Sequence, residues 1–239
     1  MTPRRNALGQ PIGDPVADWT PRPHPAITAV DGHYARLERL DPDRHARALW
    51  DANALDVTGA NWTYLSVGPF DHFEGYDAWL RAVAPAADPY FVAIVDQATG
   101  IPVGVASYLR IAPANGVIEV GHINFSPRAQ RRPVATDAMF LMMQHAFALG
   151  YRRYEWKCDA LNAPSRTAAG RLGFTYEGLF RQAIVYKGRN RDTAWYSIVD
   201  HEFPSLAGAF EAWLDPANFD GDGRQRRRLS DLTAEARRG

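Results

Sequence analysis

The stretch that most constrains the fold joins a strand, a short basic loop and the start of a helix. Residues 118–127 read Ile-Glu-Val-Gly-His-Ile-Asn-Phe-Ser-Pro, and residues 130–136 read Gln-Arg-Arg-Pro-Val-Ala-Thr. Such a junction turns backbone N–H groups toward one point, where the positive end of the helix dipole also lies. It predicts an α/β fold with a phosphate site. The adjacent Arg131 and Arg132 favour a ligand with more than one phosphate, such as a pyrophosphate.

The other segments predict a mixed α/β order. Strands are expected at 34–40, 91–95, 103–111, 117–125, 153–158, 175–186 and 193–199, and helices from 42, at 71–83, 134–149 and 164–172. Turn signals at Thr99-Gly100 and Asn115-Gly116 make the middle hairpins antiparallel. The strand, helix and strand from 117 to 158 should form a right-handed parallel crossover.

Composition and the positions of helix-breaking residues divide the chain into three parts. Residues 1–30 hold several prolines and predict an extended Pro-rich arm, residues 31–204 carry the α/β domain, and residues 205–239 form a C-terminal helix and a basic tail. Residues 210–219 have an amphipathic pattern, so the arm and this extension could build a homodimer. The hydrophobic content of 46% is ample for a core.

The charge balance and residue composition narrow the range of expected partners, compartments and metal sites. Lysine and arginine total 27, as do aspartate and glutamate, so nucleic acid is not the expected partner. Cys158 is the only cysteine, which suits a reducing cytoplasm, and no apolar run approaches the roughly 20 residues of a membrane span. The histidines lack metal-ligand spacing, so no metal site is expected.

The strand–loop–helix motif resembles that of the GNAT acetyltransferases, and within them the RimJ/RimL-like branch, over about residues 33–203. That family wraps the pyrophosphate of acetyl-CoA with a Gln/Arg-x-x-Gly-x-Gly/Ala loop, which matches residues 130–135 with Pro133 in place of the first glycine. Proline lacks an N–H, so one phosphate donor is lost, although Pro133 suits a first helical turn. The resemblance implies a GNAT fold, a mixed sheet of about six to seven strands flanked by about four helices, with a splayed fourth strand.

A second motif, Asn162-Ala163-Pro164-Ser165, resembles the Asn-x-x-Ser/Ala helix of the family and precedes Gly173-Phe174. The resemblance implies that Asn162 binds the pantetheine arm and that Ser165 protonates the leaving thiolate. From the residues alone, Asn162 can equally cap a helix and Gly173 end one. The expected acetyl-CoA-binding residues are Asn124, Phe125, Gln130, Arg131, Arg132, Pro133, Val134, Ala135, Thr136, Asn162 and Ser165.

The attacking amine must lose a proton, and a carboxylate can accept it. Glu119 lies 11 residues before Gln130, the position of the base in the histone-acetyltransferase branch, so Glu119 is the hypothesised base. An ordinary polar strand residue is the alternative, and His122 is the runner-up because it titrates near neutral pH. Strand alternation places Glu119 and His122 on opposite faces unless a bulge intervenes. RimJ/RimL-like enzymes often carry a glutamate base where this chain has Ile184.

The expected acceptor pocket comprises aromatic and histidine side chains, namely Trp62, Tyr64, His122 and Tyr186. The ring of Trp62 could equally anchor its loop to the core. The resemblance also implies that backbone N–H groups near Asn124 and Phe125, freed where the strand splays, stabilise charge on the thioester oxygen.

Two functions of different classes follow. The first is an acetyl-CoA-dependent N-acetyltransferase that acts on a primary amine, either a protein N-terminus or a small amine, by direct attack in a ternary complex. The second is a catalytically idle CoA-binding sensor or protein-interaction module on the same scaffold, for which Pro133 and Ile184 leave room.

Overall fold

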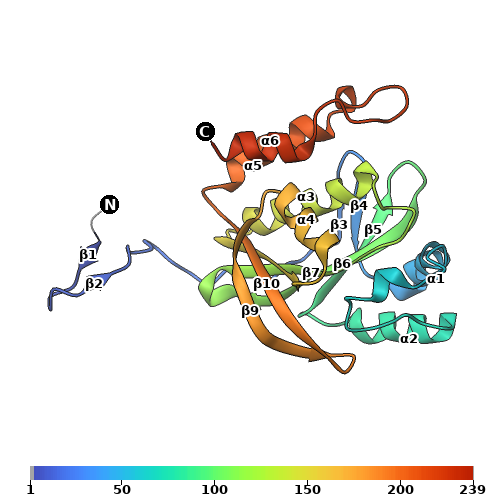
Figure 1. Ribbon diagram of the computed structural model, residues 1–239, viewed down its shortest axis with the longest axis horizontal. Helices are drawn as coiled ribbons and strands as arrows, with labels where there is room; N and C mark the ends of the chain where they lie inside the picture. The colour runs from blue at the N-terminus through green and yellow to red at the C-terminus, as the bar shows by residue number, and fades with distance from the viewer. Residues whose placement is uncertain (1–2, 239) are drawn as a thin grey trace.

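The computed structural model describes residues 3–238 and is built on a mixed eight-stranded sheet (Figure 1). The strand order is β3-β4-β5-β6-β7-β8-β10-β9, and only β7 and β8 run parallel. The strands are β3 (Ala29–Asp31), β4 (Ala35–Arg39), β5 (Tyr90–Asp96), β6 (Ile101–Ala112), β7 (Val117–Phe125), β8 (Arg153–Asp159), β9 (Thr175–Tyr186) and β10 (Arg189–Val199). The mixed α/β sheet that the sequence predicts is confirmed. The sheet exceeds the expected strand number because the end of the predicted arm pairs with β4 as β3.

Helices cover the two faces of the sheet. The helices α1 (Pro42–Asn53) and α2 (Phe73–Val83), with the short 3₁₀ turn η1 (Ala60–Trp62) between them, pack on one face over part of the sheet. The opposite face carries α3 (Pro133–Ala148), α4 (Ala163–Arg171), α5 (Phe203–Leu214) and α6 (Leu229–Ala236). The sequence predicts about four flanking helices and one C-terminal helix, and the C-terminal segment contributes two, α5 and α6.

Of the α-helices between residues 3 and 238, α1 and α4 begin with a side-chain cap and the other four do not. The Asp41 side chain accepts the Asp43 N–H at 3.0 Å at the start of α1, as the sequence predicts. The helix predicted from residue 71 by the capping-box spacing of Asp71 and Glu74 begins later, because His72 is the N-cap of α2 and no side chain bonds its first turn. Residues 71 and 72 instead belong to the connection from η1.

The fourth strand of the predicted order, β7, splays from its parallel neighbour. Pairing between β7 and β8 covers Val117–Val120 against Arg153–Trp156 and then ends. A bulge at the same level lets three residues of β7 span two of β6, and His122 there has a φ of 47°. The bulge turns His122 to the α1–α2 face, where it contacts Ser107, so Glu119 and His122 share one face of the sheet.

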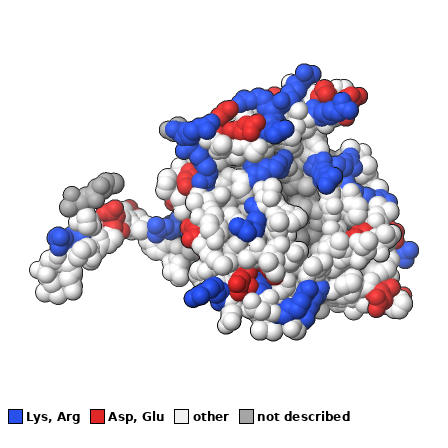
Figure 2. All heavy atoms as spheres, in the orientation of Figure 1, with Lys and Arg blue, Asp and Glu red and all other residues white. Residues whose placement is uncertain are grey.

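The ends of the chain differ in how they meet the domain. A small hairpin of β1 (Arg4–Arg5) and β2 (Pro11–Ile12) projects from the body (Figure 1), and the arm joins it at Trp19, whose Nε1 donates to Ala114 O at 2.8 Å. The amphipathic stretch at 210–219 is only partly helical, because α5 ends at Leu214 and Pro216 begins a short 3₁₀ turn. Arginines concentrate on the C-terminal segment, at the top of Figure 2.

Between residues 3 and 238, the model contains no helix with the length and apolar character that crossing a membrane requires.

Candidate active site

The N-terminus of α3 is open to a ligand. Arg132 is its N-cap in extended conformation, Pro133 occupies the first turn as predicted, and no side chain caps the helix. The N–H groups of the first turn that lack an intrahelical partner are thus free to bind an anion. Arg131 is exposed in the left-handed region, with a φ of 59°, and Arg132 lies 3.4 Å from Asp96 Oδ2. Two arginines therefore flank a helix N-terminus.

Gln130 and Thr136, which the sequence assigns to the same site, have protein partners. The Gln130 Nε2 group donates to Asn61 Oδ1 at 2.7 Å and to Phe125 O at 2.9 Å, which ties the β7–α3 loop to η1. Thr136 Oγ1 accepts a hydrogen bond of 3.0 Å from Arg171. A phosphate at this helix would therefore meet backbone groups and arginines rather than these two side chains.

Asn124 stands in the splayed half of β7 and is buried, with 2% of its surface exposed. Neither its Oδ1 nor its Nδ2 has a hydrogen-bond partner within residues 3–238. A buried amide without partners costs free energy, and buried polar groups are normally paired. The two orphaned atoms indicate that a polar ligand or water belongs at the splay.

The second motif lies on the other edge of the splay. Asn162 caps α4 by accepting the Ser165 N–H at 3.1 Å. Ser165 Oγ accepts from Trp156 Nε1 of β8 at 3.0 Å, so the hydroxyl proton remains available for donation. Burial raises the pKa of the neighbouring Cys158 thiol. Cys158 is therefore a protonated, packed thiol rather than a nucleophile.

Glu119 is a buried carboxylate between two cations, not a solvated strand residue. Its Oε1 lies 2.6 Å from Arg110 Nη1 and its Oε2 lies 2.9 Å from Lys157 Nζ. Lys157 also lies 2.7 Å from Glu155 Oε2 and sits 3.7 Å from the centre of the Trp195 ring. Burial raises the pKa of Glu119, and the two cations oppose that shift.

His122 presents a different chemistry on the same face. Its Nδ1 lies 3.0 Å from Ser107 Oγ, and its ring packs on Phe91 at 5.2 Å between centroids. Burial lowers the pKa of His122, and the positive charges of Arg110 and Arg191 lower it further. The imidazole is therefore neutral at pH 7, and its Nε2 makes no hydrogen bond within the described part of the chain.

The remaining acceptor-pocket candidates surround the splay. The Trp62 ring is only 5% exposed and packs against Phe70 and Trp79, so it anchors its loop to the core, the alternative that the sequence left open. Tyr64 Oη donates to Leu161 O at 3.2 Å across the splay. Tyr186 Oη donates to Asp159 Oδ2 at 2.8 Å, and burial together with that carboxylate raises the pKa of Tyr186 to about 12.

Sequence reasoning missed Arg110, Lys157 and Arg191, whose charges set the electrostatics of this face. Lys157 follows Glu155 by two residues on β8, and side chains two residues apart on a strand lie on the same side. The spacing was a usable signal, but the contact with Glu119 depends on the parallel pairing of β7 with β8. Ile184, opposite Arg191 in the β9–β10 ladder, carries no acid–base group.

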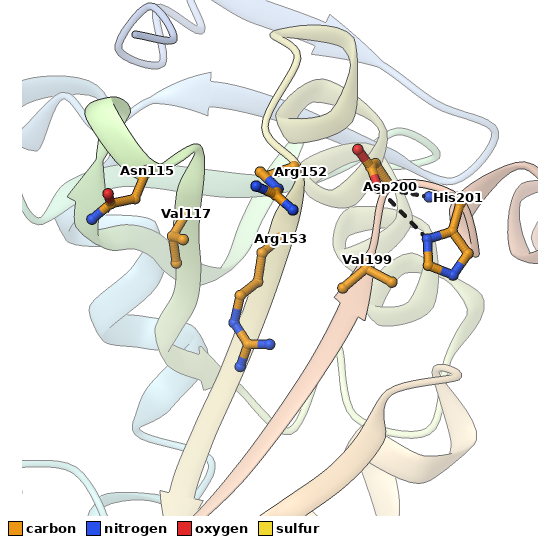
Figure 3. Close-up of a pocket in the computed structure, with 7 residues that line it drawn as sticks. All are labelled: Asn115, Val117, Arg152, Arg153, Val199, Asp200 and His201. Atoms are coloured by element: carbon orange, nitrogen blue, oxygen red, sulfur yellow. Dashed lines mark hydrogen bonds and ion pairs between the residues drawn. The ribbon is translucent and has the colours of Figure 1, made fainter. Parts of the chain in front are cut away.

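A separate hollow of about 340 Å³ lies at the other ends of the same strands (Figure 3). Arg153 lines it and extends along β8, where its Nε lies 2.6 Å from Glu155 Oε1. None of the predicted site residues reaches this hollow. Residues 3–238 contain no cluster of three or more histidine, cysteine or acidic side chains arranged to hold a metal.

Comparison with known proteins gives a consistent result. A family model described as an acetyltransferase (GNAT) domain matches residues 36–175. A crystal structure of a GCN5-related N-acetyltransferase from Brucella melitensis has 45% identity, covers 92% of this chain and 100% of its own, and has a TM-score of 0.89. A probable GNAT-family acetyltransferase from Chromobacterium violaceum has 38% identity, covers 82% and 98%, and has a TM-score of 0.76.

More distant structures share only the fold. A RimL ribosomal L7/L12 alpha-N-protein acetyltransferase has 21% identity, covers 75% of this chain and 98% of its own, and has a TM-score of 0.61. No curated protein matches the sequence significantly.

Proposed function

The chain belongs to the GNAT acetyltransferase family, and on that premise we propose that it transfers the acetyl group of acetyl-CoA to a primary amine within a ternary complex. The observation that carries the proposal is the splay of β7 from β8 beside the uncapped N-terminus of α3. One edge of the splay bears a neutral imidazole, and the other bears a serine hydroxyl with a proton to donate.

The residues of the splay fit the cosubstrate. The first-turn N–H groups of α3, with Arg131 and Arg132, would hold the pyrophosphate, and Asn162 lies where the pantetheine arm would pass. The side-chain Oδ1 and Nδ2 of Asn124 have no hydrogen-bond partner in the described residues, and a polar group of bound acetyl-CoA would supply one. Bound acetyl-CoA supplies an activated acetyl thioester. Pro133 removes one N–H donor, which leaves the arginines a larger share of phosphate binding.

We propose His122 as the proton acceptor, with Glu119 as the alternative. A base must be unprotonated and free, and His122 is neutral at pH 7 with an unpaired Nε2. Glu119 is less suited, because both of its carboxylate oxygens already contact cations, those of Arg110 and Lys157. An engaged carboxylate is a weaker acceptor because protonation would break two ion pairs. Glu119 then has a positioning role, because its carboxylate holds the side chains of Arg110 and Lys157 in place.

Ser165 is the proposed proton donor to the departing thiolate. Its Oγ already accepts from Trp156 Nε1 at 3.0 Å, and that indole N–H favours the hydroxyl orientation in which the proton points away from Trp156. Ser165 → Ala should therefore lower kcat more than it raises KM for acetyl-CoA, because the hydroxyl acts mainly in the transition state.

The experiment that tests the proposal measures release of the CoA thiol from acetyl-CoA with a panel of primary amines. Turnover with at least one amine is expected. In parallel, acetyl-CoA at 100 times its Kd should stabilise the chain by roughly 2.7 kcal/mol in a thermal-shift titration.

The control ligands are NAD and ATP, which should give no shift. Stabilisation by acetyl-CoA without turnover of any amine would favour the second candidate, an idle CoA sensor. A shift with NAD or ATP and none with millimolar acetyl-CoA would refute both.

A further inference from the structure

The hairpin that joins β9 to β10 carries three basic side chains near the splay. Lys187, Arg189 and Arg191, here called the basic rim, lie within five consecutive residues. Between residues 3 and 238 none of them forms an ion pair with a carboxylate, although most other lysines and arginines of the domain do. The basic rim is therefore an uncompensated positive charge.

Neutral oxygens hold the basic rim in place. Lys187 Nζ donates to Trp62 O at 2.7 Å, and Arg189 Nη2 donates to Thr63 O at 2.9 Å. Arg191 Nε donates to Thr193 Oγ1 at 3.1 Å, which leaves the rest of its guanidinium without a partner in the described residues. Hydrogen bonds to neutral acceptors orient a cation without cancelling its charge.

Asp192, the acid that follows Arg191 in the sequence, does not neutralise the rim. Asp192 accepts the Gln182 N–H at 2.7 Å and a hydrogen bond of 3.1 Å from Asn190 Nδ2. These bonds lower the pKa of Asp192 and keep its carboxylate turned to the backbone of β9. The positive charge of the rim is thus available to bind an anionic group of a ligand.

The contacts of η1 place the basic rim on the acceptor side of the splay. Asn61 Nδ2 donates to Phe125 O at 3.1 Å at the end of β7, and Tyr64 Oη donates to Leu161 O after β8, so this loop crosses the splay. Lys187 and Arg189 bind the carbonyl groups between those two contacts. The positive charge of Arg191 reaches His122, whose pKa it lowers.

We propose that the basic rim selects an acceptor amine that carries a carboxylate a few bonds from its nitrogen. This inference rests on the proposed function and deepens it. An arginine binds a carboxylate with paired hydrogen bonds, and Arg191 is half-buried, with only its Nε bonded to a neighbour in the described residues. The carboxylate can be that of a free amino acid or an acidic side chain next to a peptide N-terminus, because the two share one chemistry.

The test compares amines in matched pairs that differ only in the carboxylate. Leucine is paired with leucinamide for the first source, and the dipeptide amides Ser-Glu and Ser-Gln are paired for the second. The carboxylated member of at least one pair should have a kcat/KM roughly 10- to 100-fold higher, since a charge-assisted hydrogen bond is worth a factor of that order. The difference should appear mainly in KM, because the rim contacts the substrate in both ground and transition states.

Variants connect that preference to the rim. Arg191 → Met should abolish the difference within the preferred pair, and Arg191 → Lys should retain part of it. Arg181 → Met is the matched control, because Arg181 is exposed on β9 outside the hairpin turn. It should leave the difference unchanged. Equal kcat/KM within both pairs, or a preference that survives Arg191 → Met, would overturn the inference.

A binding measurement separates this inference from the proposed function. N-acetyl-leucine and N-acetyl-leucinamide are titrated against the full chain by calorimetry, without acetyl-CoA. The carboxylated probe should bind at least about tenfold more tightly, and Arg191 → Met should remove that advantage. Absence of turnover with every amine would refute the acetyltransferase proposal, whereas equal binding of the two probes would refute the role of the rim.

Discussion

Replacing Lys157 with methionine should destabilise the protein strongly and in a pH-dependent way. Within residues 3–238, Lys157 is the one cation that contacts both buried carboxylates, at 2.9 Å from Glu119 and 2.7 Å from Glu155, and its side chain is 6% exposed. Methionine keeps most of the volume and loses the charge. The two carboxylates would then lie side by side on one face of the sheet, because Glu119 and Glu155 are in register on adjacent parallel strands.

The expected loss in the free energy of unfolding is about 3 kcal/mol at pH 8. Removing one partner of a buried ion pair costs roughly 3–5 kcal/mol. The lower end applies because Glu119 keeps Arg110 at 2.6 Å and Glu155 keeps Arg153 at 2.6 Å. At about 2–4 °C per kcal/mol for a chain of this size, Tm should fall by roughly 6–12 °C.

The sign of the pH dependence follows from proton linkage. Burial already raises the pKa of Glu119 above 4.5, and loss of Lys157 raises it further. The folded state then binds more protons than the unfolded state between 4.5 and the folded pKa. The stability of Lys157 → Met should therefore be greatest below that window and fall as pH rises through it.

Urea unfolding at pH 5, 6.5 and 8 measures the effect, with Arg181 → Met as the control because Arg181 is exposed on β9. The control should change stability by less than about 0.5 kcal/mol. Adding Glu119 → Gln to Lys157 → Met should restore part of the loss, since one of the two carboxylates becomes neutral. A loss under about 1 kcal/mol, or an equal loss at pH 5 and pH 8, would refute this account of the charge cluster.

Three further predictions concern other parts of the site and core. Burial lowers the pKa of His122, so the acidic limb of the kcat/KM profile should lie below pH 6.5. His122 → Gln should remove that limb and lower kcat by roughly 10²–10⁴-fold. An unchanged limb would exclude His122 as the base. Asp137 → Ala should cost at least about 2 kcal/mol in urea unfolding, because the backbone N–H groups of Tyr34 and Ala35, at 2.6 and 2.8 Å, lose their acceptor; a neutral effect would mean that water replaces it. Trp62 → Ala should cost about 3–5 kcal/mol in the same assay, as expected for a core ring, whereas loss of acceptor affinity at unchanged stability would return Trp62 to the substrate pocket.

Local signals in the sequence located most elements of the fold. Pro42 after Asp41, Gly150 after α3 and Gly173 after α4 mark real helix ends, and both glycines have positive φ, at 83° and 89°. The strand at Val117–Phe125 is reproduced residue for residue. Short-range rules work here because a cap or a turn is settled by the few residues beside it.

Where the outcome depends on distant partners, sequence reasoning failed. Ala29–Asp31 has no strand signal of its own and becomes β3 by pairing with β4. The start of α2 shifts to His72 because the connection from η1, with Phe70 packed on Trp62, determines where the helix can begin. Neither contact can be deduced from local propensity.

By itself the sequence determined the strand–loop–helix junction, the placement of Asn162 and Ser165 on one helix turn, and hence the class of fold. Only the tertiary structure decided which candidate base is free. Strand alternation puts Glu119 and His122 on opposite faces, but the bulge at His122 brings them to the same face. The parallel pairing of β7 with β8 then sets Lys157 against Glu119 and leaves His122 neutral and unengaged at Nε2. Charge and burial at a site depend on neighbours from other strands, and those neighbours exist only after folding.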